Sequence, residues 1–582
     1  MQNRFKPIFS INISAFFLVI LSLLLVNACS QNVEDNNTLP SDRHQPFNYY
    51  GQTGMVVAAH PLAAQAGLDM LKKGGNAVDA AVATAFALNA AEPFASGIGG
   101  GGFLVIYLAK ENKVTVINFR EKAPSSSFPE MFKVQGGETS DELRREHGLS
   151  VGVPGALAGW DYALNKYGTK DLSDVIKKAV DIAENGFEVS GTFSKINKDE
   201  YEKILKNSGE DSRYLNDGFP FEPGDIFRNP ELANTFRSIA ANGIKEFYQG
   251  ETARKIVEAI QDLGGILSLE DLSSFQPIEQ EPLKGLYKDY TLYTIAPPGS
   301  GGLHIIQLLN IIENWPIKKW GFNSAAYIHH LSEAFRIVFA DRARYLGDPE
   351  FVPMPVSHLV SKNYASSIAS SINPDKPLGN YPFGDFDEKD NEKESTTHLC
   401  VVDKEGNIVS LTQSINHFFG SGIIPEGTGF LLNNHMDDFS RDPESANAPR
   451  PNRRPVSSMG PLIMFKGNEP VLVLGSPGGT RIFPSLTQII INIFDFGMNL
   501  DEAIEAPRFF SYSVNGEARD IFLESRISLE VRQILETMGQ TLFIREDYDN
   551  YFGGAQGLMI LRRKKGIHGG ADSRRDGYGA GY

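Results

Sequence analysis

The 582-residue chain has only two cysteines, Cys29 and Cys400, and little positive charge. Lys and Arg number 55 against 71 Asp and Glu, so the formal net charge is −16. Non-specific binding of nucleic acid needs a basic surface, which this composition argues against. The scarcity of cysteine leaves no disulfide framework, but a chain of this length buries a core large enough to be stable without one.

An apolar run of 12 residues stands close to the N-terminus, at 15–26, and follows the basic residues Arg4 and Lys6. Its length suits the apolar part of a signal peptide and is short for a membrane-spanning helix. The run leads into the sequence VNAC, which ends at Cys29 and resembles a bacterial lipoprotein cleavage box. We therefore expect residues 1–28 to be removed and Cys29 to carry lipid. The alternative is an ordinary signal peptide beside an incidental cysteine.

A glycine-rich stretch at 97–102 separates a helical region from a strand expected at 103–109. The helical region consists of a helix at 61–73 and a second one that Asn76 caps and that runs to about residue 89. The stretch matches GxGxxG, but a dinucleotide-binding fingerprint has its strand before the glycines and its helix after them. The reversed order predicts close backbone packing instead of nucleotide binding.

A long amphipathic helix is expected at 323–345 and carries His329, His330 and Glu333. The spacing of these residues matches neither HExxH nor a paired ExxH arrangement, so we expect no metal site there. Cys400 lies in an apolar, strand-like run and is expected to be a small buried hydrophobe, not a nucleophile. We expect no cofactor.

A polar loop at 384–394 is followed by a β-hairpin whose first strand begins at Thr396. A threonine hydroxyl is a poor nucleophile unless a base lies beside it. Cutting the chain just before the threonine frees an α-amine that acts as this base. A strand-initial threonine behind a cleavable loop is compatible with that solution, although many strands begin with threonine.

Several further motifs make the interpretation specific. They are GGNAVDAA at 74–81, NFRE at 118–121, SVGVPG at 150–155, TTHLCVVD at 396–403, NNHMDDF at 433–439, RPVSSM at 454–459, GSPGG at 475–479 and ADSRRDG at 571–577. In this order they resemble the large and small subunits of γ-glutamyltransferases. The resemblance extends from about residue 50 to residue 582.

The resemblance implies an α+β fold, the four-layer αββα sandwich of self-cleaving N-terminal-nucleophile hydrolases. Cleavage between Ser395 and Thr396 would give two chains that intertwine as a heterodimer. The expected segments are a signal peptide at 1–28, a polar tether at 29–45, a large subunit at 46–395 and a small subunit at 396–582. The protein would be exported and lipid-anchored, on the periplasmic side of the outer membrane or on the cell surface of a bacterium.

The same resemblance assigns the catalytic roles. Thr396 would attack the γ-glutamyl amide with its hydroxyl and use its new α-amine as the base, passing through a γ-glutamyl ester. Ser414 would orient that hydroxyl. The backbone N–H groups of Gly478 and Gly479 would form the oxyanion hole. The group would pass to water or to an amino acid or peptide.

Substrate recognition is implied at both charges of an amino-acid end. Arg120 would clamp the α-carboxylate with two parallel hydrogen bonds, and Ser457 and Ser458 would add hydroxyl donors. Asp438 and Asn416 would hold the α-ammonium.

Three further features bear on this assignment of substrate recognition. His435 stands where the family usually has Glu or Gln near the amine, and a histidine accepts a hydrogen bond from ammonium only while it is neutral. Asp437 is a weaker candidate, with a solvated or helix-capping carboxylate as the alternative. The segment after Phe439 is short, which favours an open cleft without a covering loop.

The leading interpretation is an exported enzyme that hydrolyses and transfers γ-glutamyl groups of glutathione-like compounds. The runner-up is an acylase of the same superfamily that acts on glutaryl side chains. Arg120 and Asp438 argue against it, while His435 keeps it open. A binding lipoprotein with a dead site is the third interpretation, and the retained Thr396 argues against that one. An active protein should appear as two fragments on a denaturing gel.

Overall fold

The computed structural model describes residues 49–381, 395–514, 517–561 and 566–582. The expected signal peptide, Cys29, the polar tether and the loop at 384–394 lie outside these residues. Within the described ranges, no helix is both long enough and apolar enough to cross a membrane.

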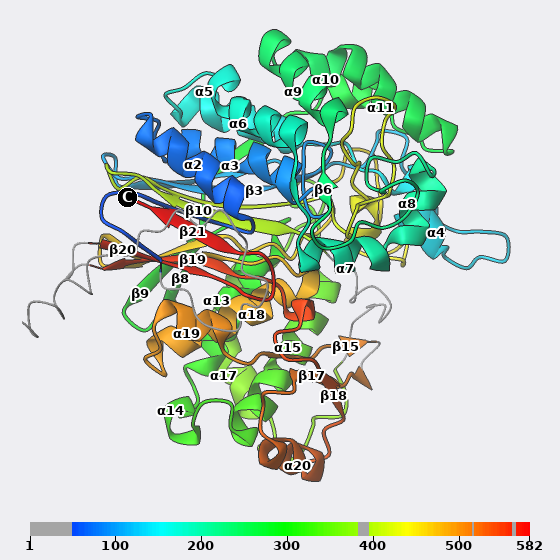
Figure 1. Cartoon of the computed structure of the whole chain (residues 1–582). Coiled ribbons are helices and arrows are strands. Elements are labelled where there is room, and N and C mark those ends of the chain that lie inside the picture. Colours follow the sequence, from blue (N-terminus) through cyan, green and yellow to red (C-terminus); the bar gives the residue numbers. More distant parts are fainter. Residues whose placement is uncertain (1–48, 382–394, 515–516, 562–565) are drawn as a thin grey trace, which may run out of the picture. The chain divides into compact units, whose positions relative to one another are not determined.

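Two seven-stranded antiparallel sheets form the centre of the fold (Figure 1). The nucleophile sheet has the order β21 (Tyr578–Gly581), β2 (Met55–Ala58), β10 (Thr397–Val402), β11 (Ile408–Ser414), β3 (Gly101–Leu108), β4 (Lys113–Asn118) and β7 (Ile278–Gln280). The second sheet has the order β1 (Tyr49–Gly51), β20 (Gly566–Ala571), β19 (Gln556–Leu561), β13 (Glu469–Gly475), β12 (Leu462–Lys466), β9 (Tyr290–Thr294) and β8 (Leu283–Tyr287). Each sheet thus takes strands from both sides of the Ser395–Thr396 bond, so the two predicted chains interlace.

Helices cover the outer face of each sheet (Figure 1). Over the nucleophile sheet lie α2 (Pro61–Lys72), α3 (Ala77–Ala91), α5 (Ala156–Tyr167), α6 (Leu172–Asn185), α9 (Pro230–Asn242) and α11 (Glu251–Asp262). Over the second sheet lie α13 (Ser300–Ile312), α15 (Ala325–Tyr345), α17 (Lys362–Ser371), α18 (Ile482–Phe494) and α19 (Leu500–Glu505). The fold is therefore α+β with four layers, αββα, as predicted.

Strand β2 shows why two apolar layers form. Its four residues are all buried, and successive side chains point to opposite faces of the sheet. Val56 and Ala58 join the core under the helices, whereas Met55 and Val57 join the core that includes the second sheet. A strand that is apolar on both faces thus marks a sheet that is covered on both sides.

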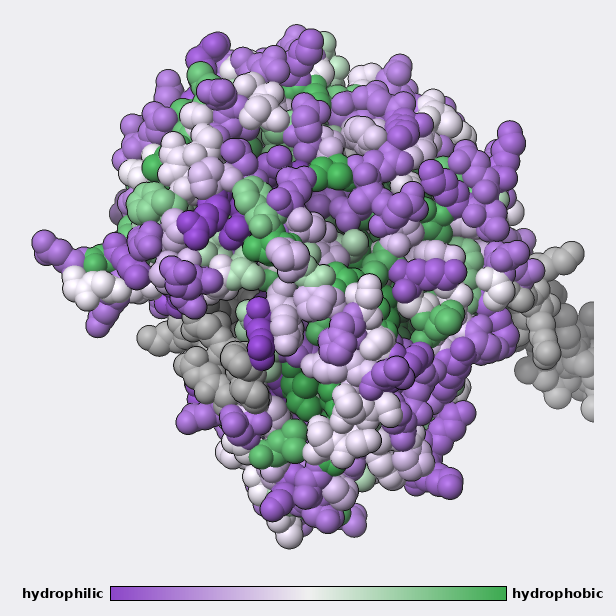
Figure 2. All heavy atoms as spheres, turned by 180° about the vertical axis from the view of Figure 1, so that it is seen from behind, coloured by the Kyte–Doolittle hydropathy of each residue, from purple (hydrophilic) through white to green (hydrophobic). Residues whose placement is uncertain are grey.

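Shorter elements complete the fold. They are α4 (Asp141–Arg145), η1 (Gly148–Ser150), β5 (Phe187–Glu188), α7 (Gly191–Asp199), α8 (Tyr201–Ser208), β6 (Ile226–Phe227), α10 (Lys245–Gln249), α12 (Leu269–Ser273), α14 (Ile317–Trp320), α16 (Val356–Leu359), η3 (His435–Asp438), η4 (Gly479–Arg481), β14 (Phe509–Phe510), β15 (Ser513–Val514), β16 (Glu517–Ala518), β17 (Ile521–Glu524), α20 (Leu529–Thr537), β18 (Leu542–Arg545) and η5 (Asn550–Phe552). The face in Figure 2 is mainly hydrophilic, with apolar side chains in small scattered patches.

The predicted helical region is present with its predicted cap. The Asn76 side chain accepts from the N–H groups of Val78 and Asp79, and Asp79 completes a capping box. Helix α3 continues to Ala91, slightly beyond the predicted end. The glycine run packs as predicted, because a Cβ on Gly100 would lie 2.0 Å from the carbonyl oxygen of Ser414.

The long helix predicted at 323–345 is α15, and both of its histidines have partners. His329 Nε2 lies 2.8 Å from the carbonyl oxygen of Asn373, and His330 Nδ1 lies 2.8 Å from that of Ala326. Each histidine ring therefore has a hydrogen-bond partner within the protein.

Candidate active site

The β10–β11 hairpin brings the predicted nucleophile to its supporting hydroxyl. The two strands pair antiparallel from Thr397 with Gln413 to Val402 with Ile408. This register places Thr396 beside the end of β11, and its Oγ1 donates to Ser414 Oγ at 3.2 Å. Both residues are buried.

The backbone is strained at the predicted cleavage site. Thr396 has φ +130°, a value that a β-branched residue rarely adopts and that costs on the order of 1–3 kcal/mol. Hydrogen bonds on both sides hold it. The Ser395 N–H donates to the Asn416 carbonyl at 2.7 Å, and Arg575 Nη1 donates to the Thr396 carbonyl at 2.7 Å.

Glu92 lies next to this strained peptide, and sequence reasoning did not find it. Its carboxyl accepts from the Thr397 hydroxyl at 2.5 Å and lies 3.7 Å from Arg575 Nη1. Burial raises the pKa of Glu92 to about 7, although the charge of Arg575 opposes the change. The nearby Asp576 raises this pKa further. A carboxyl that titrates near neutrality thus contacts the residue that follows the nucleophile.

The Gly478–Gly479 turn follows β13 and begins η4. Both glycines have positive φ, +123° and +52°. Glycine adopts such values without a steric cost. The end of β13 packs against the start of β10, because a Cβ on Gly475 would lie 2.2 Å from His398 Cε1. Among the described residues, neither N–H of the turn donates to another backbone group.

Arg120 and Asp438 meet directly, although they are 318 positions apart in the sequence. Arg120 follows β4 and is fully buried; its Nη2 forms an ion pair with Asp438 Oδ2 on η3. Its Nε donates to the Pro455 carbonyl at 3.3 Å, and its Nη1 lies 3.2 Å from Glu121 Oε2. The Asp438 side chain keeps 23% of its surface exposed.

The serine pair lies on the segment that Arg120 touches through Pro455. Ser457 Oγ accepts from the Met459 N–H at 3.3 Å, and Ser458 Oγ accepts from Arg342 Nη2 at 3.3 Å. Both serines are buried.

Asn416 connects the nucleophile to the recognition turn. Its backbone N–H donates to Ser414 Oγ at 2.7 Å, and its side-chain amide donates to the Asn434 carbonyl at 3.1 Å. Its φ of +77° turns the chain sharply after β11. Asn416 therefore lies between the supporting hydroxyl and η3.

His435 is buried on η3 and faces Glu121, with Nδ1 2.7 Å from Oε1. Burial lowers the pKa of His435, as does the charge of Arg120, while Glu121 opposes both. The neutral ring is therefore favoured at neutral pH. Because Glu121 accepts, the contact assigns the proton to Nδ1 and leaves Nε2 as an acceptor.

Asp437 differs from the solvated or capping carboxylate considered above, and that alternative is wrong. Arg144 Nε binds its Oδ1 at 2.6 Å, and Arg145 and His417 reach its Oδ2 at 3.2 and 3.1 Å. Burial by itself raises the pKa of Asp437, but the charge of Arg144 and the hydrogen bond of His417 hold it well below its usual range. Asp437 is thus part of a buried ion cluster beside Asp438.

Two further expectations concern the surroundings of the site. Cys400 is buried as predicted; its Sγ lies 3.1 Å from His398 Nε2, and burial raises the pKa of the thiol. The short segment after Phe439 turns back at once, since the Ser440 N–H donates to the Asn447 carbonyl at 2.9 Å. The Asn447 amide in turn donates to the Asp438 carbonyl at 2.7 Å.

Comparison with known proteins gives consistent matches. A family model described as gamma-glutamyltranspeptidase matches residues 63–582. The "Glutathione hydrolase proenzyme" of Escherichia coli (strain K12) is 39% identical over 542 residues, which cover 91% of this chain and 92% of that protein.

Two solved structures have the same fold. The cephalosporin acylase from Bacillus halodurans has a TM-score of 0.82 at 29% identity and covers 95% of this chain and 99% of its own. The γ-glutamyltranspeptidase from Helicobacter pylori has a TM-score of 0.54 at 38% identity and covers 58% of this chain and 95% of its own.

Proposed function

The chain belongs to the γ-glutamyltranspeptidase family, and on that premise we propose that it hydrolyses and transfers the γ-glutamyl group of glutathione-like compounds. It is a processed two-chain enzyme that acts on small molecules. The observation that carries the choice of substrate is the direct pairing of Arg120 with Asp438.

This pair is complementary to one particular chemical group. An α-amino acid carries its carboxylate and its ammonium on the same carbon atom, so a matching site needs a cation and an anion side by side. Arg120 and Asp438 meet that need, because they form an ion pair with each other. A glutaryl group has the carboxylate alone and would leave Asp438 without its partner.

Maturation would use the strained peptide. In our proposal the Thr396 hydroxyl attacks the carbonyl carbon of Ser395, and the peptide bond becomes an ester as its nitrogen takes up a proton. Water then hydrolyses the ester, which leaves a carboxylate on Ser395 and a free α-amine on Thr396. The φ of +130° favours the step, because cleavage releases the strain.

Turnover would use the same hydroxyl. The α-amine of Thr396 takes the proton as Oγ1 attacks the γ-carbonyl carbon, and Ser414 holds the hydroxyl in place. The N–H groups of Gly478 and Gly479 would stabilise the oxyanion. The leaving amine takes the proton, and water or an amino acid then attacks the γ-glutamyl ester on Thr396.

The remaining polar residues would complete recognition. Ser457 and Ser458 would donate to the α-carboxylate. Asn416 and the Nε2 atom of His435 would accept from the α-ammonium beside Asp438. The neutral form of His435 that its surroundings favour supports this role.

A donor comparison tests the proposal. The purified protein is assayed with γ-glutamyl and glutaryl anilides, which differ by the α-amine alone. Loss of one hydrogen bond to a charged group costs about 1.5–3 kcal/mol, so kcat/KM should favour the γ-glutamyl donor by about 10- to 150-fold. A preference for the glutaryl donor would assign the chain to the acylases, as the fold shared with a cephalosporin acylase allows.

We also propose that the protein is exported and anchored by lipid at Cys29. The basic residues, the apolar run at 15–26 and the VNAC sequence support this. Cys29→Ser should move the protein from the membrane fraction to the soluble fraction of its bacterial host. Equal membrane association of both proteins would contradict the anchor.

A further inference from the structure

The turn that carries Asp438 is bound by an arginine from the other side of the cleavage site. Arg144 lies on α4, and its side chain is 2% exposed. Its Nη2 donates to the carbonyl of Asp437 and, at 2.6 Å, to the carbonyl of Phe439, while its Nε binds the Asp437 carboxylate. The guanidinium thus holds the backbone immediately before and immediately after Asp438.

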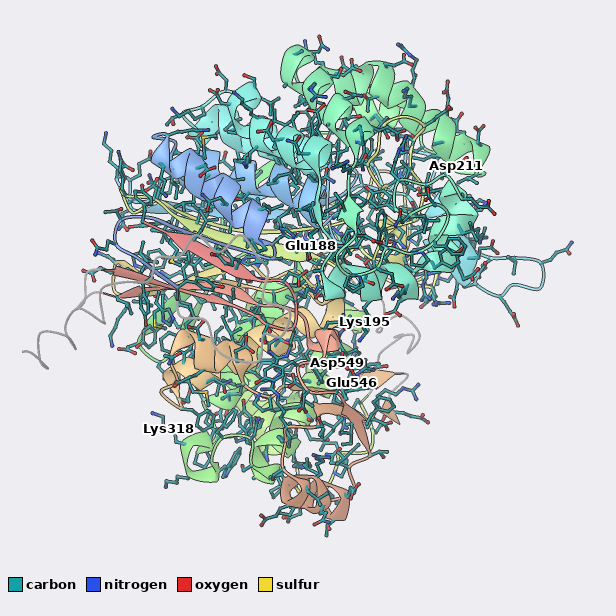
Figure 3. The ribbon with its side chains drawn as sticks, in the orientation of Figure 1. Glu188, Lys195, Asp211, Lys318, Glu546 and Asp549 are labelled. Carbon is teal, nitrogen blue, oxygen red and sulfur yellow. The ribbon has the colours of Figure 1, made fainter. Side chains whose placement is uncertain are left out.

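Neighbouring side chains make further hydrogen bonds to the same turn. Arg145 and His417 bind the second oxygen of Asp437, so that carboxylate is held on both oxygens. Asn447 holds the Asp438 carbonyl from the opposite side. The ion cluster around Asp437 is buried, whereas other charged side chains, such as Lys318 on α14 and Asp211 after α8, lie on the outer surface (Figure 3).

The backbone of Asp438 needs this support because Arg120, the ion-pair partner of Asp438, is also the proposed ligand of the substrate carboxylate. Its carboxylate is partly exposed and pairs with Arg120, which is fixed by Pro455 and Glu121. Once a substrate carboxylate occupies Arg120, Asp438 must stay in place to meet the ammonium. A displacement of about 1 Å at such a group costs up to roughly 100-fold in rate.

We propose that Arg144 is a positioning residue for the α-ammonium of the substrate: it fixes the η3 turn so that Asp438 selects donors that carry an α-amine. This inference rests on the proposed function. The hydrogen bonds at the cleavage site join Thr396 to Ser414 and Arg575, and Ser395 to Asn416. None of them involves Arg144, so self-cleavage should not depend on it.

The test uses Arg144→Lys in the complete self-cleaved enzyme, with both chains present. Lysine keeps the charge but cannot reproduce the planar fork that reaches two carbonyls and a carboxylate. We expect normal self-cleavage and a KM for the γ-glutamyl anilide that rises about 10- to 100-fold, with a smaller change in kcat. The Ki of L-glutamate should rise in parallel, whereas the Ki of glutarate, which lacks the amine, should stay within about twofold.

Arg336→Lys is the matched control. Arg336 is equally buried, pairs with Glu333 and donates to Ser511 at 2.9 Å, but it lies on α15 over the other sheet. The Arg336→Lys substitution should lower the melting temperature and leave the ratio of the Ki values of L-glutamate and glutarate unchanged. If Arg144→Lys does not fold, Asp437→Asn replaces it; the ratio should then shift less but in the same direction.

The outcomes separate the two claims. A wild-type protein that does not turn over the γ-glutamyl anilide would refute the proposed function. A wild-type protein that does so, with the two Ki values rising equally in Arg144→Lys or not at all, would refute the role of Arg144 alone.

Discussion

Replacing Glu92 by Gln in a chain that cannot cut itself should change how stability depends on pH. The background is Thr396→Ala, which keeps the peptide beside Glu92 intact. The surroundings of Glu92 raise its pKa from 4.5 to about 7, burial being the largest cause. At about 1.4 kcal/mol per pH unit, this difference corresponds to roughly 3 kcal/mol.

The sign follows from the proton that the folded state retains. Between pH 4.5 and 7 folded Glu92 binds a proton that the unfolded chain has lost, so the parent loses stability as pH rises through this window. The glutamine amide of the Glu92→Gln variant cannot ionise. The variant should therefore gain roughly 3 kcal/mol relative to the parent between about pH 4.5 and 8, on top of a constant offset for the altered contacts with Thr397 and Arg575.

Thermal unfolding at a series of pH values measures this difference. The unfolding entropy is about 2.1 cal/mol/K per residue, which gives roughly 1.1 kcal/mol/K for the compact part of the chain, residues 44–582. A stability difference of roughly 3 kcal/mol should therefore make the difference in Tm between the variant and the parent grow by about 3 °C from about pH 4.5 to pH 8. Glu530→Gln, on the exposed part of α20, is the control and should leave the curve unchanged. A difference in Tm that stays constant with pH would refute the reasoning.

Three further predictions concern the proposed chemistry. Thr396→Ala should abolish both self-cleavage and turnover. A variant that is a single uncut chain on a denaturing gel but is active in the anilide assay would contradict this. Arg120→Lys should lower kcat/KM by about 10- to 1000-fold because the bidentate fork is lost, while self-cleavage persists; normal kinetics would place the carboxylate clamp elsewhere. Protonation of His435 should raise KM more than it lowers kcat, and because its surroundings lower its pKa, the rise should occur below the usual pH of about 6.5. His435→Gln should flatten that acid limb of KM and leave the alkaline limb unchanged, so superimposable profiles from about pH 5 to 9 would remove His435 from the site.

The fold was predictable because its signals are local or carried by motifs. Asn76 and the glycines that follow the first helix mark helix ends by their own backbone chemistry. The four-layer arrangement came from the family resemblance, since composition gives no sheet order. Periodicity identified α15 but not the partners of its histidines.

The contacts of the site were less accessible. The pairing of Arg120 with Asp438 joins positions 318 apart, and that of Arg144 with Asp437 joins positions 293 apart. Nothing local distinguishes Glu92 or Arg144 from other charged residues, because their roles depend on burial and on which strands the sheets bring together. For the same reason a solvated Asp437 remained an alternative, whereas two arginines and a histidine bind its carboxylate.

The central claim is that the N-terminal threonine of the small chain carries the γ-glutamyl group. The most direct test mixes the mature enzyme with a γ-glutamyl anilide, quenches it with acid within one turnover and measures the mass of each chain. The account predicts that the small chain alone gains the mass of one γ-glutamyl group, and that fragmentation locates it on Thr396. A label on another residue, or release of the free aniline with no labelled chain at any time, would contradict the account.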